Sequence, residues 1–241
     1  MRQLILAMIL LASGCSAPLP PGVLRYKKPA SEIAGPIPGF GPFKAPLDAL
    51  MKACPFLLSL PNAVGQRLDE TDPEHELSWH QSTEYCAWVY YTPDNNYEMS
   101  WVTTPAVQDE IAARHCSLPP RVHDSRYPDD SIRYVYAIHT HPFPEKGRLS
   151  EGDILYILRQ GERHGRAFVN RDGVINLANI AFFRKPGQDG QHCNSFYQYT
   201  PMTGELQEWS RGENSTWKVA NYGRVTSWRN ERGELKVKIV K

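Results

Sequence analysis

Two histidines separated by one residue, His139 and His141, are followed by Pro142 and, a short distance on, by Ser150 and Asp153. Imidazole nitrogens and carboxylate oxygens are ligands that zinc prefers in proteins. Two histidines and one aspartate leave one coordination position open, as in catalytic rather than structural zinc sites. The residue types therefore predict a Zn²⁺ site with His139, His141 and Asp153 as ligands, and the chemistry of a metal-dependent hydrolase.

The two histidines lie at the end of a predicted strand over residues 133–139. Successive side chains of a strand point to opposite faces. One face should carry Tyr134, Tyr136 and Ile138, and the other Val135, Ala137 and His139. If the chain stays extended to His141, both imidazoles project in the same direction, where one cation can bind them.

Asp153 begins a predicted helix over residues 153–160, in which Ile154, Ile157 and Leu158 recur at helical spacing. Gly161 and Gly165 are expected to end it. A carboxylate in the first turn is favoured by the helix dipole. The same fact supplies an alternative, because Ser-x-x-Asp before an apolar run is also the pattern of a helix capping box without any metal.

The order His-x-His-Pro, a short loop and Ser-x-x-Asp resembles the JAMM (MPN-plus) zinc peptidases, over roughly residues 47–185. The resemblance implies His139, His141 and Asp153 as zinc ligands and Ser150 as the group that stabilises the oxyanion. It also implies an upstream glutamate as general base and acid. One departure is that eight residues separate His141 from Ser150, where the family has seven.

Glu84 is the best placed of the upstream glutamates. It begins an aromatic, apolar run over residues 84–91, which predicts a buried strand. A turn at residues 92–96 and a return strand at residues 97–103 should follow. Glu74, Glu76 and Glu98 are weaker candidates, each expected on a solvated loop or strand face.

The chemistry expected from this resemblance is hydrolysis of an amide bond in a peptide or an isopeptide. Zinc with an open position lowers the pKa of bound water to about 7. Glu84 would move the proton to the leaving amine, and Ser150 would stabilise the oxyanion. The alternative is a non-catalytic binding or scaffold lipoprotein with the same fold.

The N-terminus has the features of a bacterial lipoprotein signal peptide over residues 1–14. Arg2 precedes an apolar run, Leu4 to Leu11, that is too short to span a bilayer. The end of the run, Leu11-Ala12-Ser13-Gly14-Cys15, resembles a lipobox, which implies lipid attachment at Cys15. An ordinary cleaved signal is the alternative. Ser16 after the cysteine resembles the pattern of outer-membrane sorting, so we expect a lipid-anchored protein of the cell envelope that faces the periplasm.

Charge and composition limit the classes of partner that we expect. Lys and Arg number 27 and Asp and Glu 26 in the full chain. Removal of residues 1–14 takes away Arg2 and leaves no formal net charge, so nucleic acid is not an expected partner. We expect instead a peptide or protein substrate, including cell-wall peptide, and a membrane reached through the lipid anchor.

Four cysteines remain after Cys15: Cys54, Cys86, Cys116 and Cys193. An even number in an oxidising compartment predicts one or two disulfides. Three pairings are possible and the sequence does not choose among them. Cys86, inside a predicted buried strand, has the alternative of being an apolar free thiol.

The domain organisation follows from these segments. Seven prolines in residues 15–45 favour an extended, poorly packed tether. A mixed α+β or α/β domain is expected over residues 46–185, with a JAMM-like central β-sheet flanked by helices. A first helix is predicted over residues 47–60. Residues 186–241 contain short β-prone runs and are expected to form an antiparallel β extension.

Overall fold

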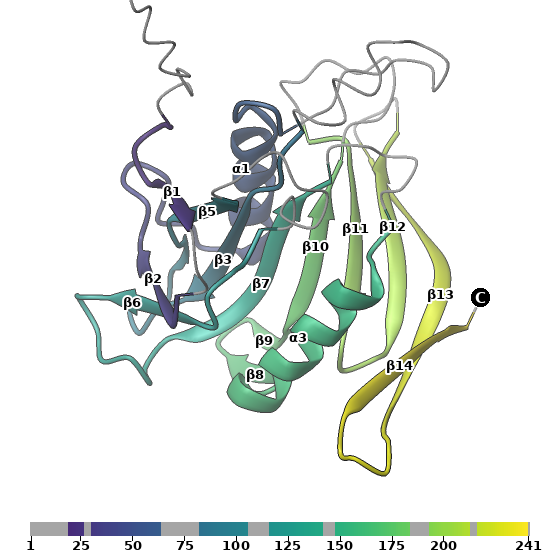
Figure 1. Ribbon diagram of the computed structural model, residues 1–241. Coiled ribbons are helices and arrows are strands. Elements are labelled where there is room, and N and C mark those ends of the chain that lie inside the picture. The colour runs from purple at the N-terminus through teal and green to yellow at the C-terminus, as the bar shows by residue number, and fades with distance from the viewer. Residues whose placement is uncertain are drawn as a thin grey trace, which may run out of the picture.

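A large mixed β-sheet with one helix on each face dominates the computed structural model (Figure 1). The structure describes residues 19–26, 30–63, 82–105, 116–141, 148–183, 193–212 and 216–240. The predicted signal peptide and Cys15 lie outside these residues. Within them the fold is α+β, as expected, with two helices, α1 (Pro46–Leu58) and α3 (Glu151–His164).

The main sheet has ten strands. Nine of them run in the order β1-β5-β3-β7-β10-β11-β12-β13-β14, and β4 pairs with β3 outside this path. The strands of the first half are β1 (Val23–Tyr26), β3 (Cys86–Tyr91), β4 (Tyr97–Met99), β5 (Val102–Pro105), β7 (Arg133–Thr140) and β10 (Ala178–Phe182). The second half is β11 (Ser195–Thr200), β12 (Glu205–Arg211), β13 (Trp217–Arg229) and β14 (Leu235–Val240). Two small sheets pair β2 (Glu32–Gly35) with β6 (Arg121–Asp124), and β8 (Ala167–Asn170) with β9 (Gly173–Asn176).

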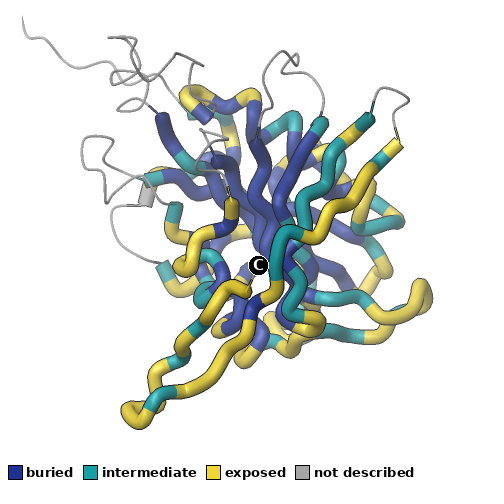
Figure 2. The backbone as a smooth tube through the Cα atoms, turned by 90° about the vertical axis from the view of Figure 1, so that its right-hand side faces the viewer, coloured by how far each residue is buried: buried dark blue, intermediate teal, exposed yellow. Residues whose placement is uncertain are grey.

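The centre of the sheet is buried on both faces. Strand β3 pairs antiparallel with β7, and β7 pairs parallel with β10. Every residue of β3 and of β10 is buried, in keeping with their aromatic and aliphatic sequences (Figure 2). Helix α1 packs with Ala87 and Val89 of β3 on one face, and α3 packs with Trp88 and Tyr90 on the other. Strand β7, which ends beside the two histidines, therefore lies between two buried strands at the centre of the sheet.

Both predicted helices form, with shifted ends. Helix α1 begins at Pro46, where proline without an N–H is tolerated, and buries Leu50, Ala53 and Leu57. Helix α3 extends beyond its predicted end at residue 160 and includes Gly161, which is buried and where a Cβ would come within 3.1 Å of Arg166 Cγ. The helix ends at Gly165, whose φ of 90° suits glycine.

The predicted alternation of β7 is wrong in its first half. Val89 of β3 pairs with Tyr136, but Tyr90 pairs with Tyr134, so Val135 is an extra residue in a β-bulge. The bulge turns Val135 toward the α1 layer and Tyr134 toward the α3 layer, the reverse of the prediction for each. Beyond the bulge the register is regular, and Ala137 and Ile138 lie on opposite faces, as expected.

The N-terminal segment packs onto the domain over its described part, residues 19–26 and 30–45. Strand β1 pairs parallel with β5, and β2 pairs parallel with β6. Neither strand contains a proline, and the apolar side chains of Ile33 in β2 and of Ile37 and Phe40 after it are buried. The prediction of a poorly packed tether is therefore wrong here, because these apolar side chains reach the core.

The C-terminal strands β11 to β14 are antiparallel, as predicted, and they continue the main sheet directly from β10. Most of β13 and β14 is exposed (Figure 2). The predicted return strand over residues 97–103 is divided into β4 and β5 by Ser100 and Trp101. Ser100 Oγ accepts a hydrogen bond from the Trp88 backbone N–H, which takes the place of a regular ladder bond there.

Two disulfides cross-link the described chain, Cys54–Cys193 and Cys86–Cys116. Their Cα–Cα distances of 5.5 and 5.8 Å are ordinary for disulfides. The alternative of Cys86 as a free apolar thiol is therefore wrong. Disulfides persist in oxidising compartments, so the pairing indicates an extracytoplasmic protein. Among the described helices, neither is both long and apolar enough to cross a bilayer.

Candidate metal site

His139 and His141 lie where β7 ends, and the chain between them is extended, as predicted. Thr140 N–H donates to the carbonyl of Tyr85 at 3.0 Å, and the Thr140 hydroxyl oxygen accepts from Tyr85 N–H at 3.1 Å. On the other side, His141 N–H donates to the carbonyl of Phe182 at 2.7 Å. These bonds to both neighbouring strands fix the backbone on which the imidazoles stand.

The two imidazoles converge. Their Nε2 atoms are 2.9 Å apart, and the residues are only 6% and 9% exposed. Two Nε2 atoms this close either share one proton or direct two lone pairs at a common point. The second arrangement is the one that a cation requires.

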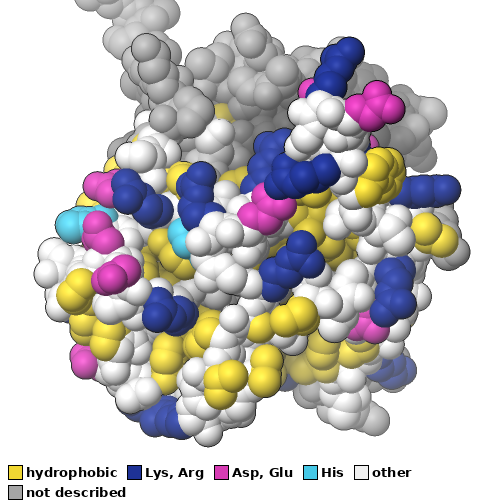
Figure 3. Space-filling view, turned by 90° about the horizontal axis from the view of Figure 1, so that it is seen from below, with side chains coloured by type: hydrophobic (Ala, Val, Ile, Leu, Met, Phe, Trp, Pro, Cys, Tyr) yellow, Lys and Arg dark blue, Asp and Glu magenta, His cyan; other side chains and the backbone are white. Residues whose placement is uncertain are grey.

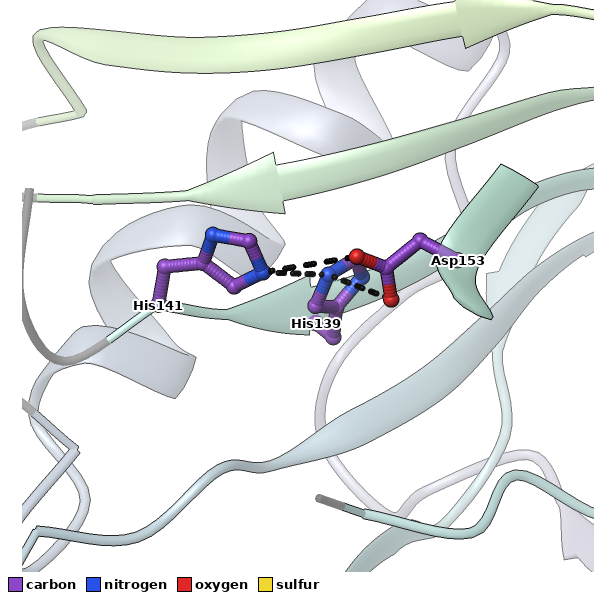
Figure 4. Close-up of side chains that lie close together, drawn as sticks. All are labelled: His139, His141 and Asp153. Atoms are coloured by element: carbon purple, nitrogen blue, oxygen red, sulfur yellow. Dashed lines mark hydrogen bonds and ion pairs between the residues drawn. The ribbon is translucent and has the colours of Figure 1, made fainter. Parts of the chain in front are cut away.

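Asp153 completes the group from the first turn of α3. Its Oδ1 lies 3.5 Å from His139 Nε2, and its Oδ2 lies 3.8 Å from His141 Nε2. Figure 4 shows the three side chains pointing toward one another from the end of β7 and the start of α3. Three possible ligand atoms, one from each residue, lie within 4.8 Å of one another.

The donor set fits a divalent transition metal. A tetrahedral zinc ion with bonds of about 2.0 Å holds its ligand atoms about 3.3 Å apart. The observed separations of 2.9, 3.5 and 3.8 Å lie on both sides of that value. Imidazole and carboxylate ligands suit zinc, iron, copper and nickel, so the donor set by itself does not fix the metal.

The predicted capping box is also present. Asp153 is therefore both part of the helix cap and a candidate metal ligand. Ser150 N–H and Oγ–H donate to Asp153 Oδ2 at 2.7 and 2.8 Å, and Asp153 N–H donates back to Ser150 Oγ at 3.2 Å. The cap fixes the carboxylate in the rotamer that faces the histidines. The single hydroxyl proton of Ser150 is directed at Asp153 in this arrangement.

The electrostatics of Asp153 suit a ligand. Burial raises the pKa of its carboxyl group, but the neighbouring imidazoles and the hydrogen bonds from Ser150 outweigh burial, so the pKa lies below its ordinary value. The carboxylate is therefore ionised at neutral pH, which is the state that binds a cation.

Two members of the triad, His139 and Asp153, line a cavity of about 370 Å³. Glu84 lines this cavity together with His139, Ser150 and Asp153. Cys86 of β3 is directly opposite His139 in the ladder. Glu84, two residues before Cys86, is therefore on the same face and toward His141. Glu84 Oε2 accepts a hydrogen bond from Cys116 N–H at 3.3 Å. The structure thus brings Glu84 to the cavity, as the prediction required.

The other glutamates are elsewhere. Glu74 and Glu76 lie outside the described residues. Glu98 is not on a solvated face as predicted: it is 4% exposed, and its Oε2 accepts from Arg126 Nη2 at 2.7 Å. Arg126 follows β6 in the chain and covers Glu98, a contact between distant segments that strand periodicity does not reveal.

Sequence reasoning missed Asn179. This residue of β10 is 2% exposed, lines the cavity, and donates from Nδ2 to the main-chain carbonyl of Asp153 at 3.0 Å. Buried side-chain amides need hydrogen-bond partners, and this one ties the start of α3 to the sheet. A signal existed, because Asn179 is the one polar residue in the run Leu177-Ala178-Asn179-Ile180-Ala181.

Comparisons of the chain with protein-family models, with curated proteins and with solved structures gave no match. The class that the fold and the site define is therefore limited to an α+β protein with a candidate metal site. The role of that site has to be argued from its own geometry.

Proposed function

We propose that the protein is a zinc-dependent hydrolase of an amide bond in a peptide or an isopeptide. The observation that carries the proposal is the convergence of His139, His141 and Asp153 beside a cavity that also contains Glu84. Three ligands leave a position for water and substrate, and the cavity gives both of them access. Zinc held by such a ligand set acidifies its bound water and polarises a carbonyl group.

Glu84 is the general base and acid in this proposal. It lies on the same sheet face as the histidines, so its carboxylate can accept a proton in the cavity and deliver it to the leaving amine. His139, His141 and Asp153 hold the ion, and Asn179 positions Asp153. Ser150 would stabilise the carbonyl oxygen by donating its hydroxyl proton to the substrate in place of Asp153.

The test is a Glu84→Gln variant compared with a Glu151→Gln control. Glu151 is exposed in the first turn of α3 and does not line the cavity. The control therefore removes the same charge nearby without altering the cavity wall. We expect Glu84→Gln to keep bound zinc and to lower the rate of peptide-library digestion by about 100-fold to 10,000-fold. The control should digest at the wild-type rate. Hydrolysis retained by Glu84→Gln would remove Glu84 from the proposed role.

A second candidate is a metal-binding module without turnover. The observation that favours it is the Ser150 hydroxyl, whose proton already caps α3 through Asp153. Such a module would bind zinc and peptides but release no products. Zinc-loaded wild-type protein that binds library peptides and cleaves none would favour this candidate.

We also propose that lipid at Cys15 anchors the protein in the bacterial envelope, facing the periplasm. The lipobox-like sequence before Cys15 and the two disulfides support this location. Substrates would then be periplasmic peptides or proteins, or the peptide part of the cell wall. A Cys15→Ser variant should move the protein from the membrane fraction to the soluble fraction, and an unchanged membrane fraction would contradict the anchor.

The proposal does not extend to nucleic acid as a partner. Basic and acidic side chains are interspersed over the face seen in Figure 3, without a continuous basic stripe on that face. This agrees with the formal net charge of only +1 for the whole chain.

A further inference from the structure

One wall of the cavity is an irregular segment, Cys116 to Pro120, which we call the strap. All five of its residues line the cavity that His139 and Asp153 also line. The strap has no strand or helix conformation until β6 begins at Arg121. An irregular segment in such a place normally leaves buried carbonyls to be satisfied.

Side chains from three elements satisfy these carbonyls. Thr103 Oγ1 of β5 donates to the carbonyl of Ser117 at 3.1 Å. Tyr156 of α3 donates from its hydroxyl to the carbonyl of Leu118 at 3.1 Å. The strap is thus tied on one side to the sheet and on the other to the helix that carries Asp153.

The two prolines of the strap are held in the same way. Trp88 Nε1 of β3 donates to the carbonyl of Pro119 at 2.8 Å. His164 Nε2 of α3 lies 2.7 Å from the carbonyl of Pro120, and since a carbonyl only accepts, Nε2 carries the proton. Four consecutive carbonyls therefore have side-chain donors, and two proline rings restrict the backbone between them.

The N-terminal end of the strap is fixed to β3. Glu84, Cys86 and Trp88 are alternate residues and point to one face. Trp88 holds Pro119, Cys86 forms the disulfide with Cys116, and Glu84 accepts the hydrogen bond from Cys116 N–H. The disulfide thus places the Cys116 amide against the Glu84 carboxylate.

We propose that the strap, fixed by the Cys86–Cys116 disulfide, is the positioning element for Glu84. The inference rests on the proposed hydrolase function and adds to it a role for a disulfide that supplies no metal ligand. Cys86 and Cys116 are positioning residues, which act through the Cys116 N–H. The disulfide joins β3 to the strap, whereas the metal ligands come from β7 and α3, so we expect them to keep the metal without it.

The expected consequence is a loss of rate without a loss of metal. A glutamate side chain has three rotatable bonds, and a charge-assisted hydrogen bond from a fixed amide selects among its rotamers. A displacement of about 1 Å in a reacting group lowers a rate by about 100-fold. Without the disulfide, the amide at residue 116 is free to leave the carboxylate.

The chain offers a matched control, because its second disulfide lies on the other face of the sheet. Cys54 belongs to α1, and Cys54 and Cys193 both pack in the α1 layer, away from the cavity. The test compares the double variant Cys86→Ala/Cys116→Ala with Cys54→Ala/Cys193→Ala. Zinc content, thermal unfolding, kcat and KM on a cleaved library peptide are measured at a temperature where all three proteins are folded.

We expect Cys86→Ala/Cys116→Ala to retain one zinc per chain and to lower kcat by about 10-fold to 100-fold, with a smaller change in KM. The control variant should lose thermal stability and keep its kcat. An unchanged kcat in the first variant, a loss of its zinc, or equal losses of kcat in both variants would overturn the inference. A wild-type protein that cleaves nothing would instead remove the hydrolase proposal and this inference with it.

A milder substitution keeps the test valid if a double variant fails to fold. Tyr156→Phe removes the hydroxyl that holds Leu118 and leaves the ring in place. Tyr127→Phe is its control, since the Tyr127 hydroxyl donates to Asp94 at 2.6 Å on the surface. We expect kcat to fall several-fold in Tyr156→Phe alone, and equal kcat values in the two variants would contradict the role of the strap.

Discussion

Two clusters of charged side chains lie within this domain, and they differ in what neutralises their carboxylates. Asp124 and Glu98, at 2% and 4% exposure, share the guanidinium of Arg126, at distances of 2.6 and 2.7 Å. Tyr90 donates a further hydrogen bond to Asp124 at 2.9 Å. Asp153 instead faces two imidazoles, which carry a positive charge only when they are protonated.

The difference distinguishes a structural charge cluster from a ligand site. Arg126 is charged at every accessible pH and presents several donors, so the first group is complete within the chain. The histidines near Asp153 present ring nitrogens, which are common metal ligands. A carboxylate with two such neighbours gains a counter-charge when a cation binds, and the open cavity beside it admits one.

The largest expected effect follows from removing one ligand. His141→Ala should lower zinc affinity by more than about 100-fold, because loss of a supporting contact already costs about 10-fold to 100-fold. Metal content after zinc loading and desalting measures this. Arg126→Met should retain its zinc. Equal zinc content in wild type and His141→Ala would contradict the distinction between a structural charge cluster and a ligand site.

The second effect concerns stability. Arg126→Met leaves two buried carboxylates without their cation. Breaking a fully buried pair costs about 3–5 kcal/mol. The Arg126 side chain is 44% exposed, so solvent screening reduces the expected loss in free energy of unfolding to about 2 kcal/mol. Urea unfolding measures it, and a loss below about 0.5 kcal/mol would show that the cluster is not held by Arg126.

A smaller effect is expected from the support of the triad. Asn179→Ala removes the hydrogen bond to the main-chain carbonyl of Asp153 but leaves all three ligands. We expect zinc affinity to fall by up to about 10-fold, at the low end for an outer contact. Competition with a chelator measures the change. A fall as large as that in His141→Ala would mean that Asn179 does more than position α3.

The smallest effect is the pH dependence of the folding stability that Asp124 and Arg126 contribute. Burial raises the pKa of Asp124, but hydrogen bonds from Arg126 and Tyr90 outweigh burial and place it below its ordinary value. A lowered pKa in the folded state gives stability that is present above the unfolded pKa of about 3.9 and is lost as the pH falls below it. The stability advantage of wild type over Arg126→Met should therefore shrink below about pH 4. A constant difference from pH 7 to pH 3 would contradict the pairing.

The sequence predicted the site better than it predicted its surroundings. His139, His141 and Asp153 are close in the chain, and the strand and helix that carry them have regular patterns. The bulge at Val135 and the burial of Glu98 depend on partner strands, which local periodicity does not record. The disulfide pairing likewise required the register of β3, and the roles of Asn179 and the strap arise only from contacts between distant segments.

The N-terminal segment teaches the same lesson from composition. Seven prolines in residues 15–45 indicate an extended chain, and the described part of the segment includes the two extended strands β1 and β2. Its strands nevertheless pair with β5 and β6, because Ile33, Ile37 and Phe40 gain more from burial than a solvated tether offers. Composition described the local conformation but not its packing.

X-ray absorption at the zinc edge of the zinc-loaded protein tests the central claim most directly. The account predicts one zinc per chain with nitrogen and oxygen ligands at about 2.0–2.1 Å, including the multiple scattering of two imidazoles. Absence of bound zinc, or a shell of sulfur ligands at about 2.3 Å, would contradict the claim that His139, His141 and Asp153 form a metal site.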